Sequence, residues 1–124
     1  YDANGNWQGV TNFGTASGDT GHGIIATADS LYISGITEGD FSGEADGSGD
    51  AFLIKFNLPG MDEAWRKQVG TAGVQDWGVR VVVDSSGDVI QGLVSDGNFQ
   101  SATGQGGVDT YFIKFDSDGN QIRF

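Results

Sequence analysis

Apolar and polar positions alternate along this chain in short runs, and each run ends in residues that favour tight turns. Val79 to Asp84 reads VRVVVD, a nearly continuous β-branched run; the turn residues SSG follow it, and the apolar run Asp88 to Val94 comes next. This order predicts a strand, a tight turn and a second strand. Thr110 to Phe115 predicts a third strand, and after the turn DSDGN the residues Gln121 to Phe124 begin a fourth.

The first half of the chain repeats this order of runs. We expect its four strands at Gly23 to Thr27, Leu31 to Gly35, Ala51 to Phe56 and Ala64 to Val69. The string GDAFLIKFN is echoed by VDTYFIKFD, and the opening YDANGN matches FDSDGN near the other end. A repeat of this kind indicates a fold built from copies of one small unit, of which the chain holds about two. The matching ends lead us to expect that the units belong to, or join, a longer array.

Both faces of the predicted sheets are largely apolar. In the third strand of the second unit, Tyr111, Ile113 and Phe115 share one face, while Phe112 and the aliphatic stem of Lys114 share the other. Such a sheet needs a neighbour on each side, and radial stacking of four-stranded sheets is the propeller arrangement. We therefore predict an all-β fold of two four-stranded antiparallel blades, part of a β-propeller or of a blade-stacked assembly. A β-sandwich or jelly roll is the alternative, although neither requires the second half to copy the first.

This fold divides the chain into three parts. Residues 1–13 are predicted to form the outer strand of a preceding blade, residues 14–69 the first blade, and residues 70–124 the second blade with a partial last strand. Because strand direction alternates, the long connections Glu38 to Gly49 and Asp96 to Val108 should share one end of the sheets with the loops Thr15 to His22 and Thr71 to Trp77. We expect that end to be the binding end. Phe41 and Phe99, equivalent in the two long connections, should pin those connections to the sheets.

Composition narrows the class of protein. The chain has 22 glycines among 124 residues, a net charge of −11 and no cysteine. The negative charge repels phosphate backbones and anionic lipid surfaces, so nucleic acid is disfavoured as a partner. The absence of cysteine excludes disulfides and thiolate chemistry. No apolar run approaches the length needed to span a bilayer, so we expect no membrane insertion.

The motifs of the second unit resemble a known repeat family. DWGVRVVVDSSGDV from Asp76, followed by DTYFIKFDSDGN and accompanied by the phrase WRKQVGT from Trp65, resembles the bacterial SBBP repeat, a β-propeller repeat with blades like those of the NHL family. The resemblance covers almost the whole chain. It implies a secreted or cell-surface, non-catalytic setting and names no ligand. The first unit departs from the pattern at Thr27, where the second has Asp84, so its inner turn should be built differently.

Two groups of residues are candidates for ligand chemistry. Asp116, Asp118 and Asn120 in DSDGN place oxygen ligands at alternate positions around a glycine, as calcium loops do. The segment lacks a downstream bidentate glutamate, and its counterparts DANGN and NLPGM do not keep the acids, so an ordinary turn is the alternative. The acidic side chains of TEGDFSGEADGSGD, which include Glu44 and Asp46, offer further oxygen ligands or simply a solvated loop.

The second group would bind an organic ligand. Trp77 beside Asp76 could hold a sugar, since an indole offers a flat apolar face while a carboxylate accepts hydroxyl hydrogen bonds. Packing at a blade junction is the alternative. His22 is the only histidine, so neither a Ser-His-Asp relay nor a multi-histidine metal centre can form; with Asp19 it is a candidate for ligand contact. Arg80 is expected to pair with a carboxylate such as Asp19 or Asp84.

These observations lead to one expected function and two alternatives. We expect a secreted, non-enzymatic scaffold module, extracellular or on the cell surface, whose partners are copies of itself or further repeats of a longer chain. Two blades cannot close a ring, and their exposed apolar faces would be adhesive. The alternatives are a calcium-dependent or carbohydrate-binding, lectin-like propeller and a subunit of an extracellular filament, because a contact that does not close propagates. A glycan or another protein is a further possible ligand.

Overall fold

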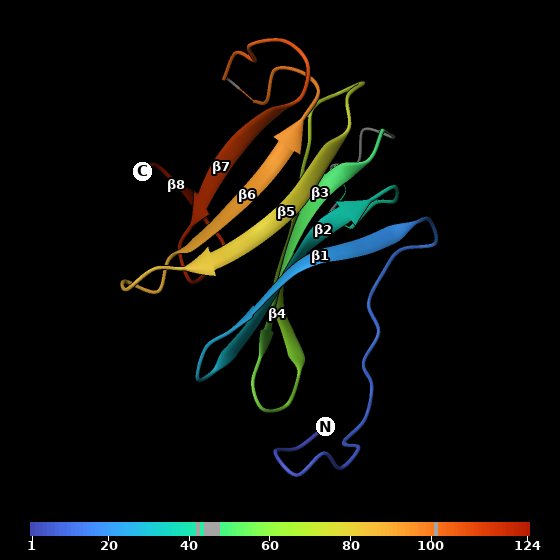
Figure 1. Cartoon of the computed structure of the whole chain (residues 1–124), viewed down its shortest axis with the longest axis vertical. Coiled ribbons are helices and arrows are strands. Elements are labelled where there is room, and N and C mark those ends of the chain that lie inside the picture. The colour runs from blue at the N-terminus through green and yellow to red at the C-terminus, as the bar shows by residue number, and fades with distance from the viewer. Residues whose placement is uncertain (42, 44–47, 101) are drawn as a thin grey trace.

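The computed structural model describes residues 1–41, 43, 48–100 and 102–124, which contain eight strands and no helix. Two four-stranded antiparallel sheets follow one another along the chain, each with its strands in sequence order (Figure 1). The bounds of the strands in the first sheet are β1 Asp19–Ala26, β2 Ser30–Thr37, β3 Asp50–Asn57 and β4 Asp62–Val69. Those in the second sheet are β5 Asp76–Val83, β6 Val89–Ser95, β7 Asp109–Phe115 and β8 Gln121–Ile122.

The predicted antiparallel strands and their order are confirmed, with the largest differences at the starts of β1 and β5, where β5 begins at Asp76 instead of Val79, and at the end of β8. β1 begins at Asp19 rather than Gly23, because its first half pairs with β2 through Asp19↔Thr37 to Gly21↔Gly35 although it carries little apolar side chain. A register shift between Gly21 and Gly23 separates the two halves of β1, and the second sheet repeats it between Gly78 and Arg80. β8 is shorter than expected and pairs with β7 only at Lys114↔Ile122 and Phe115↔Gln121.

The two sheets pack face to face, with β5 against β1, β2 and β3 of the first sheet. In Figure 1 β5 lies beside the first sheet while β7 and β8 lie farther from it. The buried core between the sheets draws on both of them. Its buried members are Tyr32, Ala51, Leu53, Val81, Val89, Leu93, Phe99, Ile113 and Phe115. This core confirms that Ile113 and Phe115 share a face.

Polar side chains and close backbone contacts fix the position of one sheet against the other. Gln91, completely buried, donates from Nε2 to the Ser34 hydroxyl at 2.9 Å and to the Phe52 carbonyl at 2.8 Å. Glycine permits the closest approach: a Cβ built on Gly23 would lie 3.0 Å from the Val79 carbonyl oxygen and 3.1 Å from the Arg80 Cα. The backbone of β5 therefore rests directly on that of β1.

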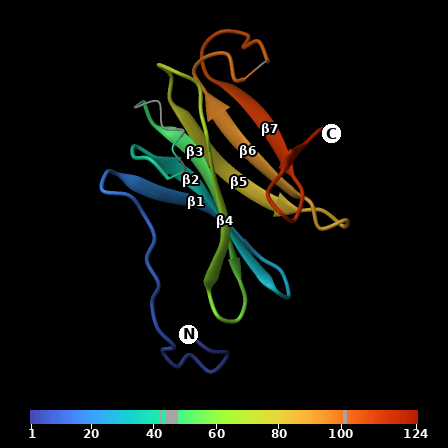
Figure 2. The ribbon, with the colours of Figure 1, turned by 180° about the vertical axis from the view of Figure 1, so that it is seen from behind.

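The other face of the first sheet has its own core. Phe52, Ile54 and Phe56 are buried there under Phe13 and Phe41, and Phe41 lies edge-on to Phe52 at 5.3 Å. Phe99 contacts Tyr111 at 5.4 Å in the second sheet, so both long connections are pinned as predicted. Residues 1–13 form no strand; Phe13 packs on the first sheet, and the N-terminus lies away from both sheets (Figure 2).

Candidate functional site

Asp76 and Trp77 point to opposite faces of β5 and do not form one site. Asp76 is completely buried, and its carboxylate accepts a hydrogen bond from the Thr71 backbone N at 2.6 Å. Trp77 pairs across the ladder with Val94 and keeps 37% of its surface exposed. Adjacent residues of a strand alternate between faces, which is the reason for this separation. Asp76 therefore closes the turn that enters β5.

Asp19 has the same role at the entrance to β1. Its carboxylate accepts hydrogen bonds from the Thr15 backbone N at 2.6 Å and from the Thr15 hydroxyl at 3.1 Å. Partial burial opposes ionisation, but hydrogen bonds from Thr37 and Thr15 outweigh it and lower the pKa of Asp19. His22 instead places Nδ1 3.1 Å from the Gly78 carbonyl oxygen of the other sheet. No hydrogen bond or ion pair joins His22 to Asp19 in the described part of the chain.

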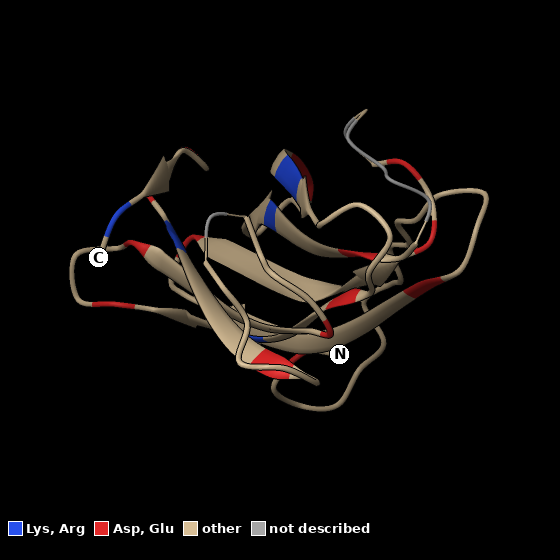
Figure 3. Ribbon diagram, turned by 90° about the horizontal axis from the view of Figure 1, so that it is seen from above, with Lys and Arg blue, Asp and Glu red and all other residues tan. Residues whose placement is uncertain are grey.

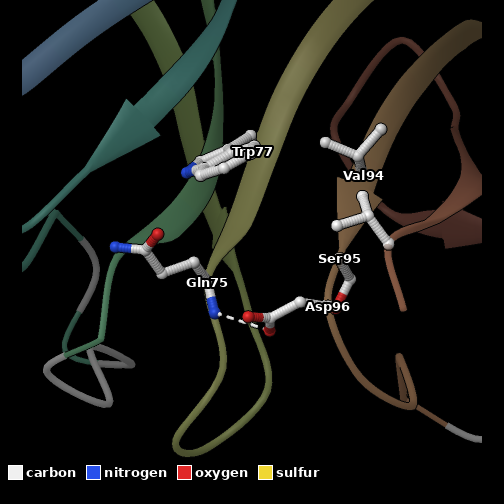
Figure 4. Close-up of a pocket in the computed structure, with 6 residues that line it drawn as sticks. Gln75, Trp77, Val94, Ser95 and Asp96 are labelled. Atoms are coloured by element: carbon white, nitrogen blue, oxygen red, sulfur yellow. Dashed lines mark hydrogen bonds between the residues drawn. The ribbon is translucent and has the colours of Figure 1, made fainter. Parts of the chain in front are cut away.

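A small hollow lies beside Trp77, at the end of the sheets where the long connections gather (Figure 4). It is lined by Gln75, Trp77, Val94, Ser95, Asp96 and Val108. Asp96 accepts a hydrogen bond from the Gln75 backbone N at 3.3 Å, which fixes the rim. The hollow has a volume of about 50 Å³, well below the roughly 300 to 1,000 Å³ of common small-molecule sites. Sequence reasoning found Trp77 but paired it with Asp76 instead of Asp96.

The turn Asp116 to Asn120 uses the Asp116 carboxylate internally. Its Oδ1 accepts the backbone N–H groups of Asp118 at 3.0 Å and Asn120 at 2.8 Å, and its Oδ2 accepts the Asn120 side chain at 3.0 Å. The Ser117 carbonyl accepts hydrogen bonds from Lys55 and from the Trp65 indole, both at 3.0 Å. The turn therefore tethers the second sheet to β3 and β4 of the first. Calcium binding here stays a prediction, for which calorimetric titration is the measurement.

The same turn occurs at two other places. Asp2 and Asp84 accept backbone N–H groups from the residues two and four positions later, as Asp116 does, at 2.8 to 3.1 Å. A glycine three positions after each aspartate has a φ of 80°, 87° or 82°. The likeness between the first and last turns was visible in the sequence, whereas the SSG turn at Asp84 was not recognised as a third copy. Asp84 also forms an ion pair with Lys114 at 2.9 Å. The predicted pair of Asp84 with Arg80 is not formed.

These turns make folding stability depend on pH. Hydrogen bonds from the side chain and backbone of Asn120 lower the pKa of Asp116, and the hydrogen bond from Lys114 lowers that of Asp84. A carboxyl whose pKa is lower in the folded state stabilises the fold above its unfolded pKa, about 3.9, and loses that effect as pH falls through the folded value. We expect the melting temperature to fall as the pH is lowered below about 4.

Asp116→Asn should reduce the melting temperature at pH 7 by a few degrees and flatten its fall at low pH. Asp118→Asn is the matched control, because the turn uses the backbone N of Asp118 and its side chain is exposed. Calorimetric melting curves between pH 7 and pH 2.5 make the comparison. Equal melting curves for Asp116→Asn and the unmodified chain would show that the turn carboxylate contributes nothing.

Acidic residues lie mainly in loops and at strand ends around the molecule (Figure 3). Glu44 and Asp46 of the predicted acidic loop lie outside the described residues. Within the described ranges, no group of three or more histidine, aspartate or glutamate side chains is placed to hold a metal ion. The described residues also contain no helix of the length and apolarity that crossing a bilayer requires.

The largest candidate site is the outward face of the second sheet. We name it the open face; its members, taken from the strand register, are Trp77, Arg80, Val82, Ile90, Gly92, Val94, Thr110, Phe112 and Lys114. The equivalent positions of the first sheet form what we name the junction face, which packs on the second sheet. Its members are Thr20, Gly23, Ile25, Tyr32, Ser34, Ile36, Ala51, Leu53 and Lys55.

The two faces differ sharply in exposure. Leu53 is 0% exposed in the junction face, whereas its equivalent Phe112 is 63% exposed in the open face. Val82 is likewise 50% exposed. Contiguous exposed apolar side chains on a sheet are a mark of an interaction surface. The sequence predicted that both faces need neighbours, and the structure adds which face of which sheet is left uncovered.

No protein-family model matches the chain, and no curated protein sequence matches it. The SBBP-type resemblance therefore rests on the residues quoted for it and stays a prediction.

Proposed function

We propose that this chain is a secreted, non-enzymatic repeat module that acts as a structural or binding scaffold by packing sheet on sheet, as the blades of a propeller do. One observation carries the proposal: the positions buried at the junction between the two sheets recur, uncovered, on the open face. A surface that is buried in one copy of a unit and bare in the next is complementary to a further copy of that unit.

The opposite side of the molecule offers the complementary half of such a contact. Val81 of the second sheet faces the junction and is 6% exposed. Its equivalent in the first sheet is Ile24, which is 66% exposed. The open face of one chain corresponds to the first-sheet side of the internal junction. The Ile24 side of another chain corresponds to the second-sheet side of that junction. Contacts of this head-to-tail type close into a ring or extend into a filament, depending on the rotation between units.

Arg80 limits how closely a second unit can approach. It stands where the junction face has Gly23, at which a Cβ would already lie 3.0 Å from the facing backbone. Overpacked contacts typically cost about 1 to 3 kcal/mol. The net charge of −11 adds repulsion between copies. Self-association should therefore be concentration-dependent and should strengthen with salt, because the Debye length falls from about 10 Å at 0.1 M to about 3 Å at 1 M salt.

Light scattering after size exclusion, at rising protein and salt concentration, tests the proposal. We expect association above the 13.0 kDa monomer in high salt. Arg80→Gly should tighten it about tenfold, and Arg80→Met, which removes the charge but keeps the bulk, should not. A monomer at every concentration for both the unmodified chain and Arg80→Gly would overturn the proposal.

A further inference from the structure

We propose that the hollow beside Trp77 receives the loop Thr15 to Gly18 of a second copy of this chain. This inference rests on the proposed function and specifies where on the open face the second copy is held.

The internal junction already contains such a contact. The loop Thr71 to Gln75, which enters β5, lies on the corresponding corner of the first sheet. The Asp76 backbone N donates to the Gly49 carbonyl at 2.9 Å, and the Ser48 hydroxyl donates to the Val74 carbonyl at 2.6 Å. A Cβ at Gly49 would lie 3.2 Å from Ile36 and 3.9 Å from the Gln75 side chain. The corner formed by Gly49 and Ile36 is therefore a seat for the loop of the next unit.

The hollow is the same corner of the second sheet. Strand register makes Val94 equivalent to Ile36, Trp77 to Thr20, and Val108, just before β7, to Gly49 just before β3. Val108 is 62% exposed, and its carbonyl receives no backbone hydrogen bond from the residues that the structure describes. Within the chain, the Gly49 carbonyl accepts a hydrogen bond from the Asp76 N–H. The equivalent Val108 carbonyl at the hollow is therefore available to the N–H of another copy.

The loop before β1 has the geometry of the loop that fills the inner seat. Thr15 N donates to the Asp19 carboxylate at 2.6 Å, as Thr71 N donates to that of Asp76 at the same distance. Ala16, Ser17 and Gly18 are exposed. Asp19 N is accordingly the group expected to donate to the Val108 carbonyl of another copy.

The sizes of the side chains are exchanged between the two seats. In the inner seat the receiving residue, Gly49, is small, and the larger Gln75 side chain of the loop lies 3.9 Å from the position of its Cβ. In the outer seat the receiving positions are large, Trp77 and Val108, and the loop is one residue shorter and carries Ser17 and Gly18 at the equivalent positions. Because the hollow is small and mainly apolar, a loop of small residues fits it better than a sugar ring does.

Disulfide trapping tests the contact, and the chain has no cysteine of its own. Ser17→Cys and Val108→Cys variants are mixed in high salt with oxidised glutathione. We expect this mixture to give a cross-linked heterodimer. A control mixture of Ser86→Cys and Val108→Cys should give at least tenfold less product in the same time. Ser86 is an exposed control, in a turn at the other end of the sheets. Equal yields from the two mixtures would overturn the inference.

Trp77→Ala provides a second measurement that does not depend on cross-linking. We expect self-association to weaken at least tenfold while the melting temperature of the monomer changes little, and we expect no change for Trp7→Ala, whose indole is also exposed. Association that persists without Ser17–Val108 trapping and without a Trp77 effect would refute this contact but leave the proposed function intact. The absence of association in both the unmodified chain and Arg80→Gly would refute both. Binding on a glycan screen that Trp77→Ala abolishes, without self-association, would replace the loop by a sugar.

Discussion

Gly78→Ala is expected to lower the free energy of unfolding by about 2 to 4 kcal/mol. A Cβ at Gly78 would lie 2.5 Å from the Gln91 amide nitrogen, 2.5 Å from the Ser34 hydroxyl and 2.7 Å from the Gly35 carbonyl oxygen. It would push the second sheet off the first and break the buried hydrogen bonds of Gln91, leaving polar groups unsatisfied. Urea unfolding followed by tryptophan fluorescence measures the loss.

Gly92→Ala is the matched control on the neighbouring strand. Its Cβ would project onto the open face, 3.6 Å from Phe112 and 4.0 Å from the Arg80 Cβ, which are ordinary contacts. Replacing a strand glycine without a clash should leave stability unchanged or raise it slightly, because the unfolded chain loses freedom. Equal loss of stability in the two variants would mean that the sheets do not pack as described.

Phe112→Asp is expected to abolish self-association while leaving the fold intact. Phe112 occupies the position of the buried Leu53, so in a stacked assembly it becomes the central apolar contact. Losing a central aromatic contact typically costs 2 kcal/mol or more, which corresponds to a rise in dissociation constant of about 30-fold, and a buried unpaired carboxylate adds to that. Sedimentation velocity in high salt measures the change.

Phe124→Asp controls for the added charge. Phe124 is 77% exposed and lies beyond β8, outside the open face, so association should persist in this variant. A parallel loss of association in Phe112→Asp and Phe124→Asp would indicate a nonspecific effect of charge. Unchanged association in both would exclude the open face as the contact surface.

Much of the fold was predictable because the signals are local. Runs such as VRVVVD and DTYFIKF carry the β-branched and aromatic residues that mark strands, and the aspartate–glycine turns separate them. The early start of β1 was missed because Thr20 and Gly21 are held by pairing with β2 and not by apolar side chains. How readily a residue adopts a strand depends on the partner strand as much as on the residue itself, so a segment of this kind is not recognised as a strand from its own residues.

The candidate sites were less predictable because they depend on contacts distant in sequence. The junction uses Gln91, a polar residue in an apolar run, to bridge Ser34 and Phe52 of the other sheet. Trp77 was identified as a candidate, but its neighbours Asp96 and Val108 come from the two opposite ends of a long connection. Which apolar face stays uncovered follows from how the sheets stack, and repetition of sequence alone does not reveal it.

Hydroxyl-radical footprinting at low and high protein concentration tests most directly whether the open face is the surface that a second unit covers. Trp77 and Phe112 lie on that face, whereas Trp7 and Phe124 are exposed elsewhere and provide internal references. We expect oxidation of Trp77 and Phe112 to fall several-fold on concentration in high salt, while oxidation of Trp7 and Phe124 stays constant. Oxidation of all four that is independent of concentration, or protection confined to Trp7 and Phe124, would contradict the account.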